Sequence, residues 1–340
     1  YRLLERGPQL GHSWANTYDS LTLHTGKHMS ALPGKPFPRR TPLFPTRHDF
    51  LAYLHDYARR FGIEVEPGVH VDRVSREDHT WIARAGQREY TARALVMATG
   101  IMAKPLIPQI AGRESFRGEV LHSVDYRRPA PFAGRRVLVV GVGNSGGEIA
   151  SELGRAGVDI TILVRSGANV VPRAILGVPI QYIAYGLRRL PPRAREAIAA
   201  RVQTITERRR GPPVLPRPPW GPLDSIPLIG FHLVDAIRDG LVGVRLGSLE
   251  SFMPDGVRFT DGQQEHFDIV IFATGFAPAI DALGDLVRRD ARGFAVRRDR
   301  VASADQPDLY FVGHNYDATG GLANIRTDAV FVGARLARSG

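Results

Sequence analysis

The feature that most constrains the fold is a glycine-rich motif that follows a predicted strand. An apolar run at residues 137–140 leads directly into Gly141-x-Gly143-x-x-Gly146, residues 148–156 then form a predicted helix, and a second apolar run follows it. This order is typical of a Rossmann-type unit, in which the glycines permit a tight turn and let a pyrophosphate approach the helix N-terminus. We therefore expect a bound dinucleotide at Gly141, Gly143, Asn144, Ser145 and Gly146.

The residue after the second apolar run indicates which dinucleotide binds. An NAD enzyme carries an acidic residue at about this place, roughly 20 residues past the motif, for the ribose 2′-hydroxyl. Here the position holds Arg165, followed by Ser166. A guanidinium pairs bidentately with a 2′-phosphate and Ser166 offers a second donor, so the sequence favours NADP(H) over NAD(H). The alternative is a solvated arginine in an arginine-rich chain.

Two similar apolar strands indicate a second nucleotide site. Residues 94–100 and 268–275 each end in Ala-Thr-Gly. Small residues at the carboxyl end of a strand let a chain or a cofactor pass close to the sheet, where doubly wound folds bind ligands. Either copy alone is equally a buried strand and turn. Together they predict two interleaved nucleotide-binding domains, with contacts from Thr99, Gly100, Ala273, Thr274 and Gly275.

Composition excludes several classes of function. The 340 residues carry a net charge of +11, and all but three of the 45 basic residues are arginines, which are scattered along the chain. No nucleic-acid-binding module accompanies them, so we do not expect a nucleic-acid partner. The absence of cysteine excludes disulfides and dithiol redox centres. The sequence contains no apolar run of about 18 residues, so it predicts no transmembrane segment, and no signal peptide is visible. We therefore expect a cytoplasmic protein.

A linker before the glycine motif carries a family resemblance. It contains Phe116-x-Gly118-x-x-x-His122-x-x-x-Tyr126, which resembles the fingerprint of class B flavin-dependent monooxygenases. The pattern is most similar to the flavin-containing monooxygenase branch and its YUCCA-like members, and it extends over essentially the whole chain. Further matches are Gly11-x-x-Trp14, Leu21-x-Leu23-His24, Pro36-Phe37-Pro38, Phe44-Pro45-Thr46, Val171-Pro172-Arg173 and Phe272-Ala273-Thr274-Gly275-Phe276.

The resemblance implies an α/β fold with two Rossmann-like, doubly wound nucleotide-binding domains. A discontinuous FAD domain would comprise residues 1–130 and 276–340, and an NADP domain residues 131–275, with an insertion around 185–225. It also implies FAD and NADP(H) as cofactors, O2 and a small organic molecule as substrates, and a homodimer as one possible assembly. A C4a-(hydro)peroxyflavin would perform N- or S-oxygenation or oxidative decarboxylation of a 2-oxo acid.

The resemblance also implies roles for residues outside the glycine motif. Glu5 matches the acidic residue that ends the second strand of the FAD domain, and only four residues precede it, so we expect this domain to lack its first strand, its phosphate turn and its first helix. His122 would organise the NADP site or serve as a structural histidine. His24 and Thr25 match the region facing the flavin. Arg6, Gly11, Trp14, Gly321 and Leu322 are further expected FAD contacts, and Asn324 and Asp317 either border the substrate pocket or cap the last helix.

Other interpretations stay open at this point. A Baeyer-Villiger monooxygenase has a similar fingerprint, but it usually ends in tryptophan where this chain has Tyr126. A non-catalytic NADP-binding relic would account for the short front of the FAD domain. Residues 188–219 combine arginines with a proline cluster, which predicts either a solvated insertion of the NADP domain or a surface that docks a partner or a membrane.

Overall fold

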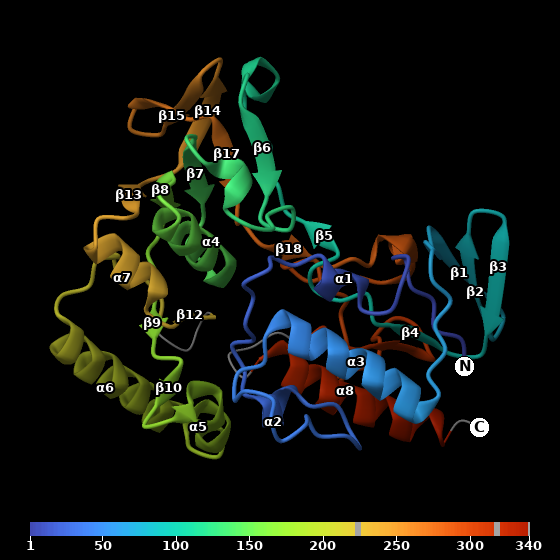
Figure 1. Cartoon of the computed structure of the whole chain (residues 1–340). Coiled ribbons are helices and arrows are strands. Elements are labelled where there is room, and N and C mark those ends of the chain that lie inside the picture. The colour runs from blue at the N-terminus through green and yellow to red at the C-terminus, as the bar shows by residue number, and fades with distance from the viewer. Residues whose placement is uncertain (222–225, 316–319, 339–340) are drawn as a thin grey trace. The chain divides into compact units, whose positions relative to one another are not determined.

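The computed structural model describes residues 1–221, 226–315 and 320–338. They form two compact units, one made of Tyr1–Pro105 and Phe276–Gly340 and the other of Leu106–Gly275 (Figure 1). The first unit is therefore built from two separate stretches of the chain. The sequence placed its first boundary after residue 130, but β6 (Glu119–His122) pairs with β17 (Ile269–Phe272) inside the second unit, so the boundary lies at residue 105.

The second unit is built on a five-stranded parallel sheet. Its order is β13-β8-β7-β17-β6, and every neighbouring pair is parallel. The other three strands are β7 (Arg136–Val140), β8 (Asp159–Val164) and β13 (Gly243–Leu246). Helix α4 (Asn144–Arg155) connects β7 to β8, which confirms the predicted strand, turn, helix and strand. The result is the doubly wound arrangement expected of a nucleotide-binding unit.

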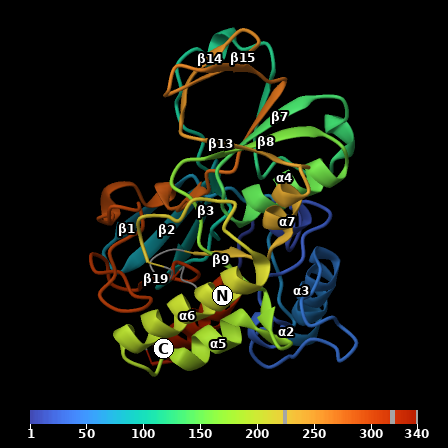
Figure 2. The same ribbon diagram turned by 90° about the vertical axis from the view of Figure 1, so that its left-hand side faces the viewer.

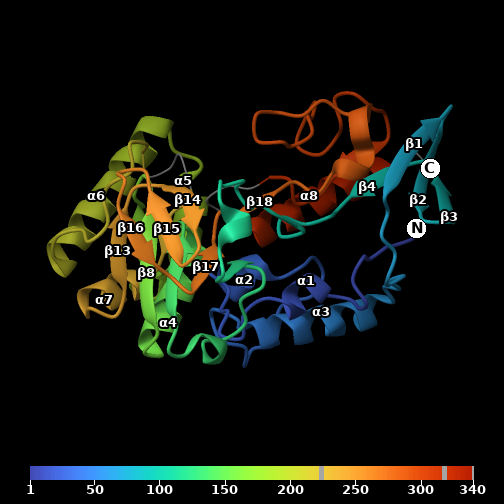
Figure 3. The same cartoon turned by 90° about the horizontal axis from the view of Figure 1, so that it is seen from above.

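Both faces of this sheet are covered. Helix α4, with α7 (His232–Arg238) beside it, covers one face, and an antiparallel meander covers the other (Figures 1 and 3). The meander comprises β14 (Leu249–Met253), β15 (Gly256–Phe259) and β16 (Gln264–His266). Because both faces are covered, the central strands β7, β8 and β17 are mostly apolar runs rather than alternating ones. The core between sheet and meander includes Leu138, Leu163, Val270 and Phe272 against Phe252, Val257 and Phe259.

The segment between β8 and α7 holds the remaining elements of the second unit. Two short pairs lie in it: β9 (Val170–Val171) is parallel to β12 (Leu228–Ile229), and β10 (Ala174–Ile175) forms a hairpin with β11 (Val178–Pro179). Helices α5 (Ile180–Leu187) and α6 (Pro192–Arg210) follow the hairpin. Two 3₁₀ turns, η1 (Arg113–Ser115) and η2 (Ala130–Phe132), lie before β7.

The first unit combines an antiparallel sheet with short parallel pairings. The antiparallel sheet is a meander of β1 (Arg73–Glu77), β2 (Thr80–Ala85) and β3 (Arg88–Ala92). Strand β4 (Leu95–Met97) is parallel to β19 (Leu309–Phe311), and no described strand pairs with its other edge. Strand β5 (Lys104–Pro105) is antiparallel to β18 (Phe276–Ala277), and η3 (Asp281–Leu286) follows. A core that includes Trp81, Leu283 and Phe311 joins these elements.

Helices complete the first unit. They are α1 (His12–Ala15), α2 (Lys27–Ser30), α3 (Arg47–Phe61) and α8 (Gly321–Leu336). Helix α3 begins with a capping box, because the Thr46 hydroxyl accepts from the Asp49 N–H while the Asp49 carboxylate accepts from the Thr46 N–H. Val332 of α8 packs on Tyr310 of β19. Strand β19 therefore contacts α8 as well as its paired strand β4.

Candidate functional site

The carboxyl edge of the five-stranded sheet brings most of the predicted NADP residues together. Gly141 follows β7, Arg165 follows β8, Ala273 follows β17, and His122 is the last residue of β6. Parallel neighbours end at the same edge, so these four positions form one row. The chain leaves β7 toward β8 on one side and has β17 on the other, which makes this the switch point where open α/β sheets bind ligands.

The glycine turn has the geometry of a dinucleotide site. Gly141 has a φ of 109°, and its N–H donates to the Leu163 carbonyl at 3.1 Å. A Cβ on Gly146 would lie 2.1 Å from the Gly141 oxygen, so helix and turn pack too closely for any side chain. By contrast, a Cβ on Gly143 would meet no atom within 4 Å. The open space beside Gly143 therefore fits a phosphate group, while Gly141 and Gly146 shape the protein around it.

The first turn of α4 offers donors to an anion. Gly143 is the N-cap, and no side-chain hydrogen bond caps the helix. Ser145 is half-buried and its hydroxyl makes no hydrogen bond with any described residue. The Asn144 side chain, predicted as a cofactor contact, is used differently: it donates to the Pro227 carbonyl at 3.1 Å and accepts from the Ile229 N–H at 2.8 Å. Asn144 therefore fastens β12 to the helix, and only its backbone remains for a ligand.

Arg165 and Ser166 lie at the end of β8, next to the glycine turn. Arg165 is exposed and makes no ion pair or hydrogen bond through its side chain within the described chain. Ser166 is half-buried and equally unengaged. An unpaired guanidinium beside a hydroxyl at this position fits the 2′-phosphate of NADP(H).

The fingerprint residue His122 is used by the protein backbone on both ring nitrogens. Its side chain is only 1% exposed. Nδ1 accepts from the Val124 N–H at 3.1 Å, which leaves the proton on Nε2, 3.0 Å from the Gly275 carbonyl. Burial lowers the pKa of His122 below its ordinary value because the charged form loses its hydration. The imidazole ring is therefore neutral and hydrogen-bonded at both nitrogens. It holds the turn after β17 in place, which indicates a positioning role rather than proton transfer.

The same fingerprint is joined to α4 by a contact that the sequence did not reveal. The buried Tyr126 hydroxyl donates to a Glu152 carboxylate oxygen at 3.0 Å, and Asp125 accepts from the His122 N–H at 3.1 Å. Glu152 is half-buried on a helix face that otherwise carries small and apolar residues, which was its only signal. The fingerprint therefore connects β6, the β17 turn and the helix that starts at the phosphate site.

Replacing His122 with alanine is expected to lower the free energy of unfolding by about 3 kcal/mol, because it leaves the partly buried Val124 N–H and Gly275 carbonyl without their His122 partners. Urea denaturation of the full chain measures this. His122→Asn, which can restore one of the two bonds, is expected to recover part of the loss. A loss below about 1 kcal/mol for the alanine variant would contradict the positioning role.

In the first unit, Glu5 and the turn after β4 are placed as a nucleotide site requires. One Glu5 carboxylate oxygen accepts from the Gly7 N–H at 2.7 Å, and the other makes no hydrogen bond with a described residue, which fits a ribose hydroxyl. Thr99 and Gly100 follow β4 and are exposed, with Gly100 at a φ of 75°. Arg6 is turned to the protein, since its guanidinium donates to the Ala103 carbonyl at 3.4 Å.

Thr25 lies against the start of α8. Its hydroxyl is buried and 2.6 Å from the Ser30 hydroxyl, and a Cβ on Gly320 would lie 2.5 Å from the Thr25 methyl. Gly320 is the N-cap of α8, which begins at Gly321 without a side-chain cap. Thr25 and the start of α8, which were both predicted to face the flavin, therefore lie side by side. Thr25 contacts Gly320 through its methyl group, and its hydroxyl is already hydrogen-bonded to Ser30. Ser30 was missed, because nothing in the sequence indicates that its hydroxyl would bond to Thr25.

Two of the other predicted FAD contacts pack against an apolar cluster with their side chains, and the third is a glycine. Trp14 packs edge-on against Phe50 with ring centroids 4.4 Å apart, and Leu322 packs against the same apolar cluster. Gly11 is the N-cap of α1 with a φ of 75°. Only the backbone of these residues is suited to a cofactor contact. His24 is half-buried and already has a partner.

A buried polar network lies along the first half of α8. Asp328 is fully buried; it pairs with Arg300 at 2.6 Å and accepts from Asn315 at 2.9 Å. Arg300 also donates to Asn324 at 2.8 Å, and Asn324 donates to the Gly320 carbonyl. Asn324 therefore belongs to this network and is not the N-cap. Asp317 lies outside the described residues.

His314, beside this network, is a buried neutral histidine. Its ring packs against Phe311 and Phe294, with centroids 5.0 and 5.6 Å away, and it is 6% exposed. Burial and the nearby charge of Arg297 lower the pKa of His314 from 6.5 to about 4. The unfolded chain therefore binds a proton more readily than the folded one between these values.

We expect stability to fall as the pH is lowered from 7.5 to 5. The pKa of His314 is about 4 in the folded chain and 6.5 when the residue is exposed, so between these values His314 gains a proton mainly on unfolding. At pH 5 this lowers the free energy of unfolding by roughly 2 kcal/mol. Urea denaturation at both pH values measures the loss. In a His314→Gln variant most of this pH dependence is expected to vanish, and an equal dependence in both proteins would assign it to other groups.

Among the described residues no group of three or more His, Asp or Glu is placed to hold a metal ion. Nor does any described helix have the length and apolarity needed to cross a membrane.

Comparison with known proteins shows the family of the chain. The family model described as flavin-binding monooxygenase-like matches residues 8–292. Indole-3-pyruvate monooxygenase YUCCA1 of Oryza sativa subsp. japonica is 34% identical over 303 residues, which covers 85% of this chain and 74% of that protein. YUCCA8 of Oryza sativa subsp. indica is 37% identical over 299 residues, covering 81% and 70%.

Solved structures show the same fold. A flavin-containing monooxygenase from Stenotrophomonas maltophilia superimposes with a TM-score of 0.76 at 25% identity, over 100% of this chain and 92% of that chain. Cyclohexanone monooxygenase gives a TM-score of 0.73 at 17% identity, over 99% and 82%, which concerns the fold alone.

A glycine turn at a parallel sheet edge and a second nucleotide-type unit define an oxidoreductase that uses two nucleotide cofactors. More narrowly, the chain belongs to the flavin-binding monooxygenase-like family and is a flavin-dependent monooxygenase with FAD and NADP(H) as its cofactors. The fold class predicted from the sequence is thereby confirmed.

Proposed function

We propose that the chain oxygenates a small organic molecule with one atom of O2 at the expense of NADPH, by oxidative decarboxylation of a 2-oxo acid or by N- or S-oxygenation. The 2-oxo acid comes first because the relatives that match most of the chain are named for indole-3-pyruvate, which is one. A cytoplasmic location and a homodimer stay predictions.

The observation that carries this proposal is the row of residues at the sheet edge of the second unit. The open space beside Gly143, the uncapped start of α4 and the unpaired Arg165 fit the pyrophosphate and the 2′-phosphate of NADPH. His122 and Tyr126 hold that edge to the rest of the unit through Gly275 and Glu152.

In the first unit, the residues fit a flavin nucleotide at two points. The free oxygen of Glu5 would accept from a ribose hydroxyl, and the backbone N–H groups at the start of α8 would face the ring system, with Thr25 fixing Gly320 from below. Bound FAD supplies the redox chemistry that connects NADPH oxidation to O2. The protein's own task is to orient both nucleotides and to exclude water from the reacting atoms.

The reaction to test converts a 2-oxo acid, O2, NADPH and a proton into the acid one carbon shorter, CO2, water and NADP⁺. The purified chain is supplied with FAD, NADPH and indole-3-pyruvate, and NADPH consumption is compared with formation of the shortened acid in isotopically labelled O2. We expect one labelled oxygen atom in each acid molecule formed.

Other outcomes separate the alternatives. An ester formed from a ketone substrate would identify a Baeyer-Villiger monooxygenase. NADPH consumption matched by hydrogen peroxide, with no oxygenated product from any amine, sulfide or 2-oxo acid, would identify an oxidase. NADP⁺ binding with no NADPH consumption in the presence of FAD would favour a non-catalytic NADP-binding protein.

A further inference from the structure

The net charge of the chain is concentrated in one segment. Residues 173–217 contain ten arginines and two glutamates, a net charge of +8 out of +11 for the whole chain. The rest of the chain holds 35 basic and 32 acidic residues and is nearly neutral. The arginines are scattered, as the sequence indicated, but the carboxylates that would balance them are not. This segment is therefore the strongly positive part of the molecule.

The segment also exposes large apolar side chains. It contains the β10–β11 hairpin, α5 and α6, which lie close together in both views (Figures 1 and 2). Leu176 at the hairpin tip is 97% exposed, and Tyr185 in α5 and Leu190 just after it are exposed as well. Arg188 and Arg189 lie between these last two. Exposed apolar and cationic side chains thus occur together in this segment, which an ordinary solvated loop does not require.

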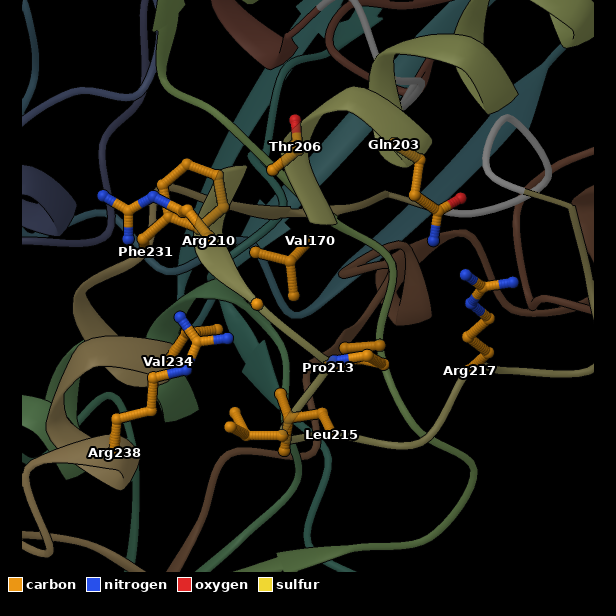
Figure 4. Close-up of a pocket in the computed structure, with 13 residues that line it drawn as sticks. Val170, Gln203, Thr206, Arg210, Pro213, Leu215, Arg217, Phe231, Val234 and Arg238 are labelled. Atoms are coloured by element: carbon orange, nitrogen blue, oxygen red, sulfur yellow. The ribbon is translucent and has the colours of Figure 1, made fainter. Parts of the chain in front are cut away.

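Helix α6 is not sealed to an apolar core. None of its described side chains is buried, although it spans 19 residues. Its inner side lines a pocket with Gln203, Thr206 and Arg210 against the proline segment and α7 (Figure 4). Its outer side presents Arg201, Ile205 and Arg208, which are spaced to share one face and are all exposed. Helices of this kind gain most of their stability from packing, so the outer face is suited to a second surface.

Five arginines of this segment have no carboxylate partner among the described residues. Arg189, Arg193, Arg201, Arg208 and Arg209 make no ion pair within the described chain, whereas Arg210 on the inner side pairs with Asp235 at 2.7 Å. Five unpaired guanidinium groups beside exposed Leu176 and Ile205 match a fluid surface that is negative outside and apolar beneath.

We propose that this surface binds to anionic lipid membranes without crossing them. It is formed by the β10–β11 hairpin, α5 and the outer face of α6. The arginines contact the headgroups and Leu176, Tyr185 and Leu190 enter the interface. A duplex nucleic acid would use the charge but not the exposed leucines, and its binding is an outcome of the test. The proposal is independent of the oxygenation chemistry.

Leu176 separates lipid insertion from simple charge attraction. It has a φ of 48°, a conformation that asparagine adopts more readily than leucine. Leu176→Asn therefore removes an apolar side chain without straining the hairpin or changing the charge.

The experiment is flotation of the full chain with vesicles of phosphatidylcholine alone or with about one third phosphatidylglycerol, at about 0.1 M and about 0.5 M salt. We expect binding to the anionic vesicles only, weakened at high salt. The triple variant Arg189→Gln, Arg201→Gln, Arg208→Gln is expected to bind about a hundredfold more weakly. Leu176→Asn is expected to bind about tenfold more weakly with an unchanged circular dichroism spectrum.

A matched control removes the same charge elsewhere. Arg40, Arg60 and Arg93 are exposed and make no ion pair within the described chain, so their triple glutamine variant is expected to bind anionic vesicles as the parent does. Equal loss in the two triple variants, or equal binding to both vesicle types, would overturn the proposal. So would binding to duplex DNA as tight as to anionic vesicles together with no effect of Leu176→Asn.

Discussion

Replacing Gly143 with alanine is expected to weaken NADP⁺ binding on the order of a hundredfold while leaving the fold intact. The N-cap Gly143 has φ of −75° and ψ of −178°, which alanine adopts freely, and its Cβ would meet no protein atom within 4 Å. The added methyl group would occupy the space beside the uncapped turn of α4, where the pyrophosphate is expected. Hydrogen bonds between phosphate and backbone N–H groups would lengthen or be lost.

The same substitution three residues on provides the contrast. A Cβ at Gly146 would lie 2.1 Å from the Gly141 oxygen, so Gly146→Ala must displace the helix from the turn. It is expected to lower the free energy of unfolding by at least about 3 kcal/mol and to abolish binding. Titration calorimetry with NADP⁺ and urea denaturation measure the two effects. Unchanged NADP⁺ affinity in Gly143→Ala would place the dinucleotide elsewhere.

Local patterns were sufficient for the elements that carry the site. The run before Gly141, the glycine spacing and Arg165 specified β7, the turn and the end of β8, because strand period and turn chemistry are local properties. The capping box at Thr46 is likewise a local feature, formed by two residues three positions apart.

Contacts between distant residues were not available from one sequence. Asn144 has a side chain that could bind a ligand, but its amide oxygen accepts a hydrogen bond from the N–H of Ile229, 85 positions later. Nothing in the sequence indicates that Tyr126 hydrogen-bonds to Glu152. Nor does it indicate that Arg300 forms an ion pair with Asp328. Residue type indicates what a side chain is able to bind, and the tertiary fold decides which partner is within reach. The boundary at residue 105 has the same cause, since it depends on β6 pairing with β17.

The choice between NADPH and NADH is expected to depend on Arg165. Arg165→Gln should weaken NADP⁺ binding by about 10- to 100-fold, the usual effect of losing charged hydrogen bonds to a phosphate, and should leave NAD⁺ binding nearly unchanged. The reason is geometric: Arg165 follows β8, next to the strand that leads into Gly141, and its guanidinium has no partner within the described chain. Calorimetric titration of each variant with both nucleotides measures the ratio.

Arg136 is the matched control for this ratio. It begins β7, at the opposite end of the strands, and pairs with Asp159 at 3.1 Å. Arg136→Gln removes the same charge from the same sheet, so it should leave both affinities unchanged if the effect of Arg165 is a local contact with the 2′-phosphate. If instead both variants weaken NADP⁺ binding equally, the general positive potential of the unit attracts the nucleotide. A loss of NADP⁺ and NAD⁺ affinity in parallel for Arg165→Gln would remove the 2′-phosphate contact and leave the choice of nucleotide to the glycine turn.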